Sequence, residues 1–131
     1  MLNDSRVEAN IPASDINRAR DFYADKLGLT PTQESMGEVL KYRTAGGTNF
    51  TVYRTDYAGQ AGHTIAQWHV DDIDAQVRDL KAKGVTFETY PDMPGATWDG
   101  EIASAPGMGR DAWFRDSEGN IMCLDQPEDG T

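Results

Sequence analysis

Near the start of the chain, apolar and polar residues alternate. Val7, Ala9 and Ile11 are apolar, while Glu8 and Asn10 between them are polar. Alternation of this kind is typical of a β-strand with one buried face. The pattern predicts a strand that packs its apolar side under a neighbouring layer and leaves Glu8 and Asn10 on the opposite, open side.

A helix is predicted directly after this strand. Its apolar stripe at helical spacing consists of Ile16, Ala19, Phe22, Tyr23 and Leu27. Ser14 offers a hydroxyl that can cap the first turn, and Asp15 places negative charge at the positive end of the helix dipole. Gly28 ends the helix, because a residue without Cβ readily adopts the left-handed conformation.

Three extended segments complete the first half of the chain. They cover residues 29–34, 38–44 and 49–54, and a turn at Ala45-Gly46-Gly47 joins the last two. The first half therefore has the order β-α-β-β-β.

The same order recurs in the second half. Residues 64–70 form a predicted strand, and a helix runs from Asp71-Asp72 to Gly84. Further extended segments are predicted at 85–90, 111–115 and 120–125. A repeat of this size indicates a duplicated module more strongly than any single element does.

Composition narrows the classes of function. The 131 residues carry a formal net charge of −10, and no basic patch is visible that could bind nucleic acid or an anionic membrane. No apolar run is long enough to cross a membrane, and the N-terminus lacks the apolar stretch of a signal peptide. Cys123 is the single cysteine, which excludes an internal disulfide. We expect a cytoplasmic protein with a small-molecule ligand, without a nucleic-acid or membrane partner.

Three motifs carry a resemblance to a known family. The first is Ala13-Ser14-Asp15-Ile16 with Phe22-Tyr23 and Leu27-Gly28-Leu29, and the second is His69-Val70-Asp71-Asp72-Ile73-Asp74. The third is Phe114-Arg115-Asp116-Ser117-Glu118-Gly119-Asn120. In this order and spacing, the motifs resemble the vicinal oxygen chelate superfamily of glyoxalases, bleomycin-resistance proteins and extradiol dioxygenases.

The resemblance implies an α+β fold in one domain over residues 1–131. Module one would cover about 5–56 and module two about 62–127. Each βαβββ module would contribute a curved mixed sheet to the wall of a cavity, with the helices outside. Many members of the superfamily dimerise, so the resemblance also implies a homodimer.

Metal-dependent members of the superfamily carry His, Gln or Glu at four strand positions. The residues at those positions here are Glu8, Tyr53, Ile65 and Cys123. Only Glu8 is a usual ligand, since isoleucine has no lone pair and a thiol favours softer metals. We therefore expect no metal and no other cofactor. The alternative is a divalent metal held by Glu8, Cys123 and His63 or His69, which would require a shift in strand register.

Alternation also predicts which side chains face the cavity. The predicted ligand-binding residues are Asn10, Thr51, Tyr53, Ile65, Gln67, Trp98, Trp113 and Cys123. Hydrogen-bonding groups beside aromatic rings suit a neutral or weakly polar organic molecule. Cys123 is expected to be a small buried filler rather than a nucleophile, because no basic neighbour is evident to lower the pKa of its thiol.

The segment Pro91–Arg110 is unusually long for an internal connection and is rich in Gly, Pro and Met. Loops of this length are commonly functional lids. Trp98 and Met108 would then close over a ligand, with Glu101 as a polar contact. A dimer contact or a surface flap is equally consistent with the composition.

Two functions from different classes follow. The first is a protein that holds or sequesters a small organic molecule without a metal, as the bleomycin-resistance branch does. The second is a lyase, isomerase or dioxygenase, either metal-dependent or using Glu8 and His69 as an acid–base pair. Glu8 and His69 would otherwise make structural hydrogen bonds or meet solvent.

Overall fold

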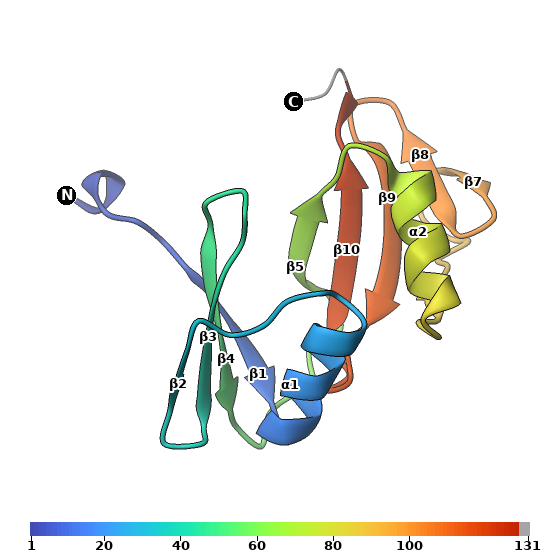
Figure 1. Cartoon of the computed structure of the whole chain (residues 1–131). Coiled ribbons are helices and arrows are strands. Elements are labelled where there is room, and N and C mark those ends of the chain that lie inside the picture. Colours follow the sequence, from blue (N-terminus) through green and yellow to red (C-terminus); the bar gives the residue numbers. More distant parts are fainter. Residues whose placement is uncertain (129–131) are drawn as a thin grey trace.

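The first half of the chain forms a four-stranded sheet with the order β1-β4-β3-β2 (Figure 1). In this computed structural model, which describes residues 1–128, a short 3-10 helix (Leu2–Asp4) precedes the sheet. The strands are β1 (Ala9–Ala13), β2 (Gln33–Ser35), β3 (Val39–Arg43) and β4 (Asn49–Arg54). Helix α1 (Ile16–Asp25) follows β1, so the predicted β-α-β-β-β order of this half is confirmed.

The second half forms a six-stranded sheet with the order β5-β10-β9-β8-β7, and β6 pairs with β9 beside this path. The strands are β5 (Thr64–His69), β6 (Phe87–Glu88), β7 (Thr97–Asp99), β8 (Ile102–Ala105), β9 (Gly109–Arg115) and β10 (Ile121–Gln126). Helix α2 (Ile73–Ala82) packs against β9 and β10. The two sheets remain separate, and strands β1 and β5 bring their edges close together (Figure 1). The α+β class with two mixed sheets agrees with the sequence prediction.

The long connection predicted for Pro91–Arg110 is wrong in part, because the segment contains the hairpin of β7 and β8. Gly100, with φ of 61°, lies in the tight turn between the two strands. Ile102 and Ala103 are buried in β8, where the chain pairs with β9. The many Gly and Pro residues around these short strands hide their alternation in the sequence.

The predicted packing of Val7 is also wrong. Its side chain is 95% exposed, and the buried apolar positions of β1 are Ile11 and Ala13. Pairing with β4 begins at Ala9, opposite Phe50, so the residues before Ala9 have no partner strand. They form an arm that leads away from the sheet (Figure 1).

The helix ends agree with prediction except at the first cap. Asp15, not Ser14, is the N-cap of α1, and its Oδ1 accepts a hydrogen bond from the backbone N–H of Arg18 at 3.0 Å. Asp72 caps α2 in the same way through Ala75. Gly28 follows α1 with a φ of 72°, which a residue with Cβ rarely adopts. No helix within residues 1–128 is long and apolar enough to cross a membrane.

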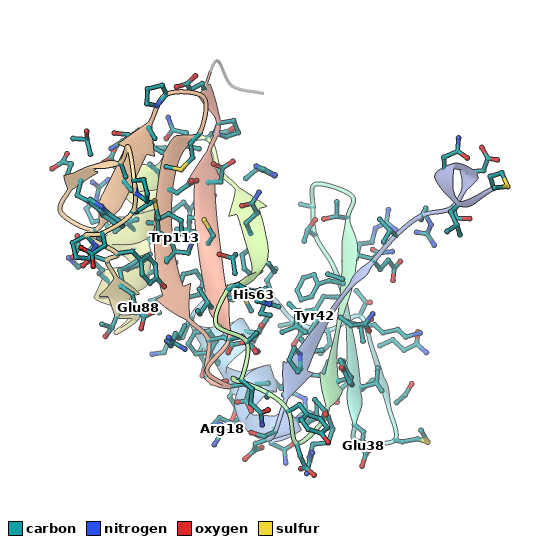
Figure 2. The ribbon with its side chains drawn as sticks, turned by 180° about the vertical axis from the view of Figure 1, so that it is seen from behind. Arg18, Glu38, Tyr42, His63, Glu88 and Trp113 are labelled. Atoms are coloured by element: carbon teal, nitrogen blue, oxygen red, sulfur yellow. The ribbon has the colours of Figure 1, made fainter. Side chains whose placement is uncertain are left out.

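One hydrophobic core joins the inner faces of both sheets and the two helices. Its largest fully buried apolar side chains are Tyr23, Tyr42, Phe114, Ile11, Leu40, Ile73, Met122 and Val52. Figure 2 shows Tyr42 on the first sheet, where its ring stacks on Phe50 with centroids 4.8 Å apart. Because α1 also contacts the turn after β9, the core and this turn fix one module against the other.

Candidate ligand site

A cleft of about 490 Å³ lies where the edge strands β1 and β5 approach each other. We call it the intermodule cleft. Its lining comes from β1 (Ala9, Ile11), the β3–β4 loop with the start of β4 (Thr44, Gly46, Thr48, Asn49, Phe50) and β5 (Ala66, Gln67, Trp68, His69). The walls are mainly apolar, and Gln67 and His69 supply polar groups at the β5 side. A concave space with apolar walls and a few polar groups is the usual form of a small-molecule site.

A smaller cavity of about 210 Å³ adjoins this cleft and shares Thr44, Trp68 and His69 with it. Its other walls are mostly apolar, formed by Leu27, Leu29, Val70, Gln76, Leu80, Phe114 and Leu124. His69 therefore borders both spaces. Its side chain is 64% exposed, so a ligand in the cleft could reach the ring.

The imidazole ring of His69 hydrogen bonds to a carboxylate on the neighbouring strand. Its Nδ1 lies 2.8 Å from Oδ2 of Asp125, which is the directly paired position on β10. Asp125 is in turn paired with Asp111 on β9. The three side chains thus form one row across three neighbouring strands, on the face of the sheet opposite to α2.

Asp111 is the most unusual member of this row. The residue is only 6% exposed, and its Oδ1 is buried without a hydrogen-bond partner among the described residues. Burial, a side-chain hydrogen bond with Asp125 and the negative charge of Asp125 raise the pKa of Asp111 to about 8. At neutral pH Asp111 therefore keeps its proton.

The neighbouring row joins Gln67, Cys123 and Trp113 across the same three strands. Cys123 is buried, and burial together with the charges of Asp111 and Asp125 raises the pKa of its thiol to about 12. The thiol therefore stays protonated, which agrees with the prediction of a buried filler rather than a nucleophile.

Trp113 and Cys123 belong to a second hydrophobic cluster, together with Ala103 and Ile121. Partly buried apolar residues cover it, namely Tyr90, Met93, Ala96, Trp98 and Met108. The ring centroids of Trp98 and Trp113 are 5.9 Å apart, and Trp113 lies on the second sheet (Figure 2). The structure thus brings the predicted ligand-binding residues Trp98, Trp113 and Cys123 together. It does so in a packed cluster, and none of the three lines either of the two cavities described above.

The predicted lid contacts are divided between this cluster and the surface. Trp98 and Met108 both cover the cluster, whereas the sequence prediction placed them over a ligand. The Nε1 of Trp98 is buried without a hydrogen-bond partner among residues 1–128. Glu101 instead forms an ion pair with Lys81 of α2 at 2.5 Å, away from the cluster.

A register shift in β5 changes the position of Ile65. Thr64 pairs with Ile121 and Ala66 with Met122, so Ile65 is the extra residue of a bulge. Ile65 packs against the main core, whereas the hydroxyl of Thr64 accepts a hydrogen bond from Trp113 Nε1 at 3.2 Å. The predicted placement of Ile65 beside Gln67 and His69 is therefore wrong.

The predicted residues of the first module lie on a separate polar surface. Strand pairing places Asn10 beside Thr51, and Tyr53 follows two residues later on the same side of β4. A pocket of about 280 Å³ there is bordered by Glu8, Thr51 and Lys41, among others. Glu8 accepts a hydrogen bond from Asn49 Nδ2 at 3.3 Å. Its carboxylate also lies 3.8 Å from Arg6.

Glu8 and His69 are therefore engaged with different partners, Asn49 and Arg6 for the first and Asp125 for the second. Asp125 and Asp111 were given no role in the sequence analysis. The only signal was an acidic residue within each of two otherwise largely apolar segments, Asp111–Phe114 and Ile121–Asp125.

The residues at the family's metal positions do not make a set of donors. Ile65 has no lone pair, and the Cys123 thiol is buried and donates to the backbone oxygen of Leu124. His63, the alternative ligand, lies on the surface with its Nδ1 3.0 Å from the backbone oxygen of Thr64. Within residues 1–128, no group of three His, Cys, Asp or Glu side chains is placed to hold a metal ion.

Comparison with known proteins agrees with the fold and names the family. The model of the Glyoxalase/Bleomycin resistance protein/Dioxygenase superfamily matches residues 6–124. The chain therefore belongs to this superfamily, as the three sequence motifs suggested. Comparison with curated proteins finds no match.

Several solved structures share the fold over nearly the whole chain. A bleomycin resistance determinant encoded on the transposon Tn5 is 18% identical, with a TM-score of 0.70 over 95% of this chain and 98% of the other. TnmS3, an antibiotic binding protein from Streptomyces sp. CB03234, is 25% identical, with a TM-score of 0.62 over 95% and 97%. FosX from Listeria monocytogenes, solved with Mn(II) and sulfate, is 17% identical, with a TM-score of 0.65 over 94% and 90%.

Proposed function

We propose that this protein binds a small organic molecule in the intermodule cleft and does so without a metal ion. The observation that carries the proposal is the cleft itself, with apolar walls from both modules and the polar side chains of Gln67 and His69 at one edge. Its volume of about 490 Å³ is in the range of ordinary ligand sites. The similarity to an antibiotic binding protein and to a bleomycin resistance determinant supports this class of function.

The proposal of metal-free binding rests on the donor set. Ile65 and the buried Cys123 replace two of the residues that would bind a metal in other members. Glu8 remains, but its carboxylate contacts Asn49 and Arg6 and borders a different pocket from the one that His69 lines. This chemistry differs from that of FosX, whose structure contains Mn(II).

Elemental analysis of the purified protein and a binding screen together test the proposal. Chelator-treated protein is expected to bind members of a library of aromatic compounds in calorimetric titrations. The Ala9→Phe variant should weaken that binding, because Ala9 is exposed at the edge of the cleft and a larger side chain would fill it. Stoichiometric transition metal in the active protein, or binding only after metal is added, would overturn the proposal.

A second candidate function is favoured by the His69–Asp125 hydrogen bond. A carboxylate that orients an imidazole is a common arrangement in general acid–base catalysis, so an isomerase or lyase could use His69 as its base. Turnover of a compound that binds in the cleft, lost in His69→Ala with binding retained, would support it. If Glu8 and His69 instead acted as an acid–base pair, Glu8→Gln would lose turnover to the same extent as His69→Ala.

We also propose that the protein is a cytoplasmic homodimer. The single buried cysteine, Cys123, suits a reducing compartment. The exposed apolar side chains of Leu2 and Val7, on the arm that leaves the first sheet, are available to contact a second copy. Sedimentation velocity should give the mass of two chains, and a monomer at micromolar concentration would contradict the homodimer.

A further inference from the structure

The hydrogen bond to Asp125 fixes the chemistry of the His69 ring. An ionised carboxylate accepts hydrogen bonds and donates none, so Nδ1 of His69 carries the proton that points to Asp125 Oδ2, 2.8 Å away. In the neutral ring, Nε2 then has a free lone pair. No other described residue hydrogen bonds to the exposed ring of His69, so this acceptor is open to a ligand.

Asp111 stabilises this arrangement from the far side of Asp125. Asp111 is nearly buried at the position paired with Asp125, and burial raises the pKa of its carboxyl to about 8, so Asp111 keeps a proton at neutral pH. The ionisable groups on the strands around Asp111 are Asp125 and the protonated Cys123 of β10, with His69 beyond them on β5. His69 therefore contacts one carboxylate of this row, that of Asp125.

The walls next to His69 indicate what else a ligand would carry. Trp68 and Phe50 line the same cleft, with ring centroids 6.3 Å apart and planes at 90°. An aromatic ring in the cleft could pack against them in a stacked or edge-to-face arrangement. Trp68 and His69 lie on opposite faces of β5, but both line the cleft because β5 is an edge strand. A molecule with an aromatic ring against Trp68 and a hydroxyl group at the edge of β5 would therefore donate to the imidazole.

We propose that the row of His69, Asp125 and Asp111 anchors a phenolic ligand in the intermodule cleft, with the phenol hydroxyl donating a hydrogen bond to Nε2 of His69. This inference rests on the proposed binding function and names the class of ligand. Asp125 and Asp111 act as positioning residues, because they hold the tautomer of His69 and do not touch the ligand.

Calorimetric titration of the metal-free full chain at pH 7 tests the inference with three probes of similar size. They are 4-methylphenol, which is neutral and donates; 4-methylanisole, which has no donor; and 4-methylbenzylamine, which is a cation. We expect 4-methylphenol to bind about tenfold more tightly than 4-methylanisole, as one hydrogen bond to a well-oriented acceptor provides. The cation should not bind more tightly than the phenol.

Variants distinguish the hydrogen bond to His69 from binding by the rest of the cleft. His69→Phe should abolish the preference for the phenol, whereas His63→Phe, the same change at a surface histidine, should leave it unchanged. Asp125→Asn should reduce the preference about threefold, because the hydrogen bond to His69 is no longer charge-assisted. A purely structural role of Asp125 would change stability and leave the ratio of the two affinities unaltered.

Each outcome decides the inference. Equal binding of the phenol and the anisole, unaffected by His69→Phe, would overturn the phenol anchor and leave the proposed binding function standing. Tighter binding of the amine would show that the row recognises cations and would equally overturn the inference. Binding of none of the three probes would reject the phenol anchor, while the wider library screen would still decide the binding function.

Discussion

The buried carboxylate of Glu118 accepts a hydrogen bond from the backbone N–H of Asp15 at 2.9 Å, although the two residues belong to different modules. Glu118 lies in the turn between β9 and β10, and Asp15 caps α1 of the first module. The same oxygen also accepts from the backbone N–H of Ser14 at 3.0 Å. One carboxylate therefore fixes the start of the first helix to the second sheet.

Glu118→Gln is expected to lower the free energy of unfolding by roughly 2 to 4 kcal/mol, since it removes a buried carboxylate that accepts several hydrogen bonds, including those of the half-exposed Arg18. The substituted amide would turn donor groups toward the guanidinium of Arg18 or the hydroxyl of Ser117, which both donate to Glu118 now. Denaturant unfolding measures the change. Asp56→Asn, which disrupts the exposed Arg54–Asp56 pair, should cost under about 1 kcal/mol. Equal losses in the two variants would contradict the account.

Acid should also act through Glu118. Burial alone would raise the pKa of this carboxyl, but the hydrogen bonds from Arg18, Asp15 and Ser117 outweigh it and lower the pKa to about 2. The folded carboxyl binds its proton at lower pH than the unfolded one, so its contribution to stability is present above about pH 4 and is lost as the pH falls toward 2. Wild-type protein should therefore lose more stability than Glu118→Gln between pH 5 and pH 2.

Asp111 should have the opposite dependence on pH. Its pKa is raised to about 8, so the folded state holds a proton that the unfolded state releases near pH 4. Stability from this group is full below about pH 4 and falls as the pH rises to 8. Asp111→Asn, which imitates the protonated carboxyl, should stabilise the protein relative to wild type by about 1 to 3 kcal/mol at pH 9 and by much less at pH 4. A difference independent of pH would show that the Asp111 carboxyl is not protonated in the fold.

The aromatic cluster over the second sheet should contribute to stability. Trp98→Ala removes a ring packed against Trp113 and should cost about 2 to 4 kcal/mol, with faster amide exchange across β7 and β8. Tyr57→Ala, at an exposed aromatic residue, should cost much less. If the cluster opened freely as a lid, Trp98→Ala would leave stability unchanged.

Metal removal should leave the folded protein unaffected. A ligand that binds only the folded state stabilises it by RT ln(1 + L/Kd), where L is the free ligand concentration, and so raises the melting temperature. Treatment with a chelator, and addition of Mn²⁺ or Zn²⁺ afterwards, should each change the melting temperature by less than about one degree. A large rise with one metal would identify a site that the donor set does not suggest.

The parts of the fold that follow from local patterns were predictable. The helices over Ile16–Asp25 and Ile73–Ala82, and the strand over Asn49–Arg54, follow from periodicity and from capping residues such as Asp72. Such signals lie within a few residues of the element they define. The hairpin of β7 and β8 was missed because its strands are short and its stability comes from pairing with β9.

The candidate site was predictable only in part, because it depends on contacts between distant segments. Gln67 and His69, which the alternation of β5 assigned to the cavity face, both line the intermodule cleft. The bulge at Ile65 and the proximity of Asp111 to Asp125 arise from the register of β10 with its two neighbours, which no local pattern specifies. The Thr44–Asn49 side of the cleft likewise depends on how the two sheets approach each other.

A map of amide chemical-shift changes tests the central claim of metal-free binding in the intermodule cleft most directly. Chelator-treated, isotope-labelled protein would be titrated with 4-methylphenol or with the tightest-binding compound of the library screen. The account predicts the largest changes at residues 44–50 and 66–69, which line the cleft from the two modules. Changes confined to the Glu8 surface or the Trp98–Trp113 cluster, or changes that require added metal, would contradict it.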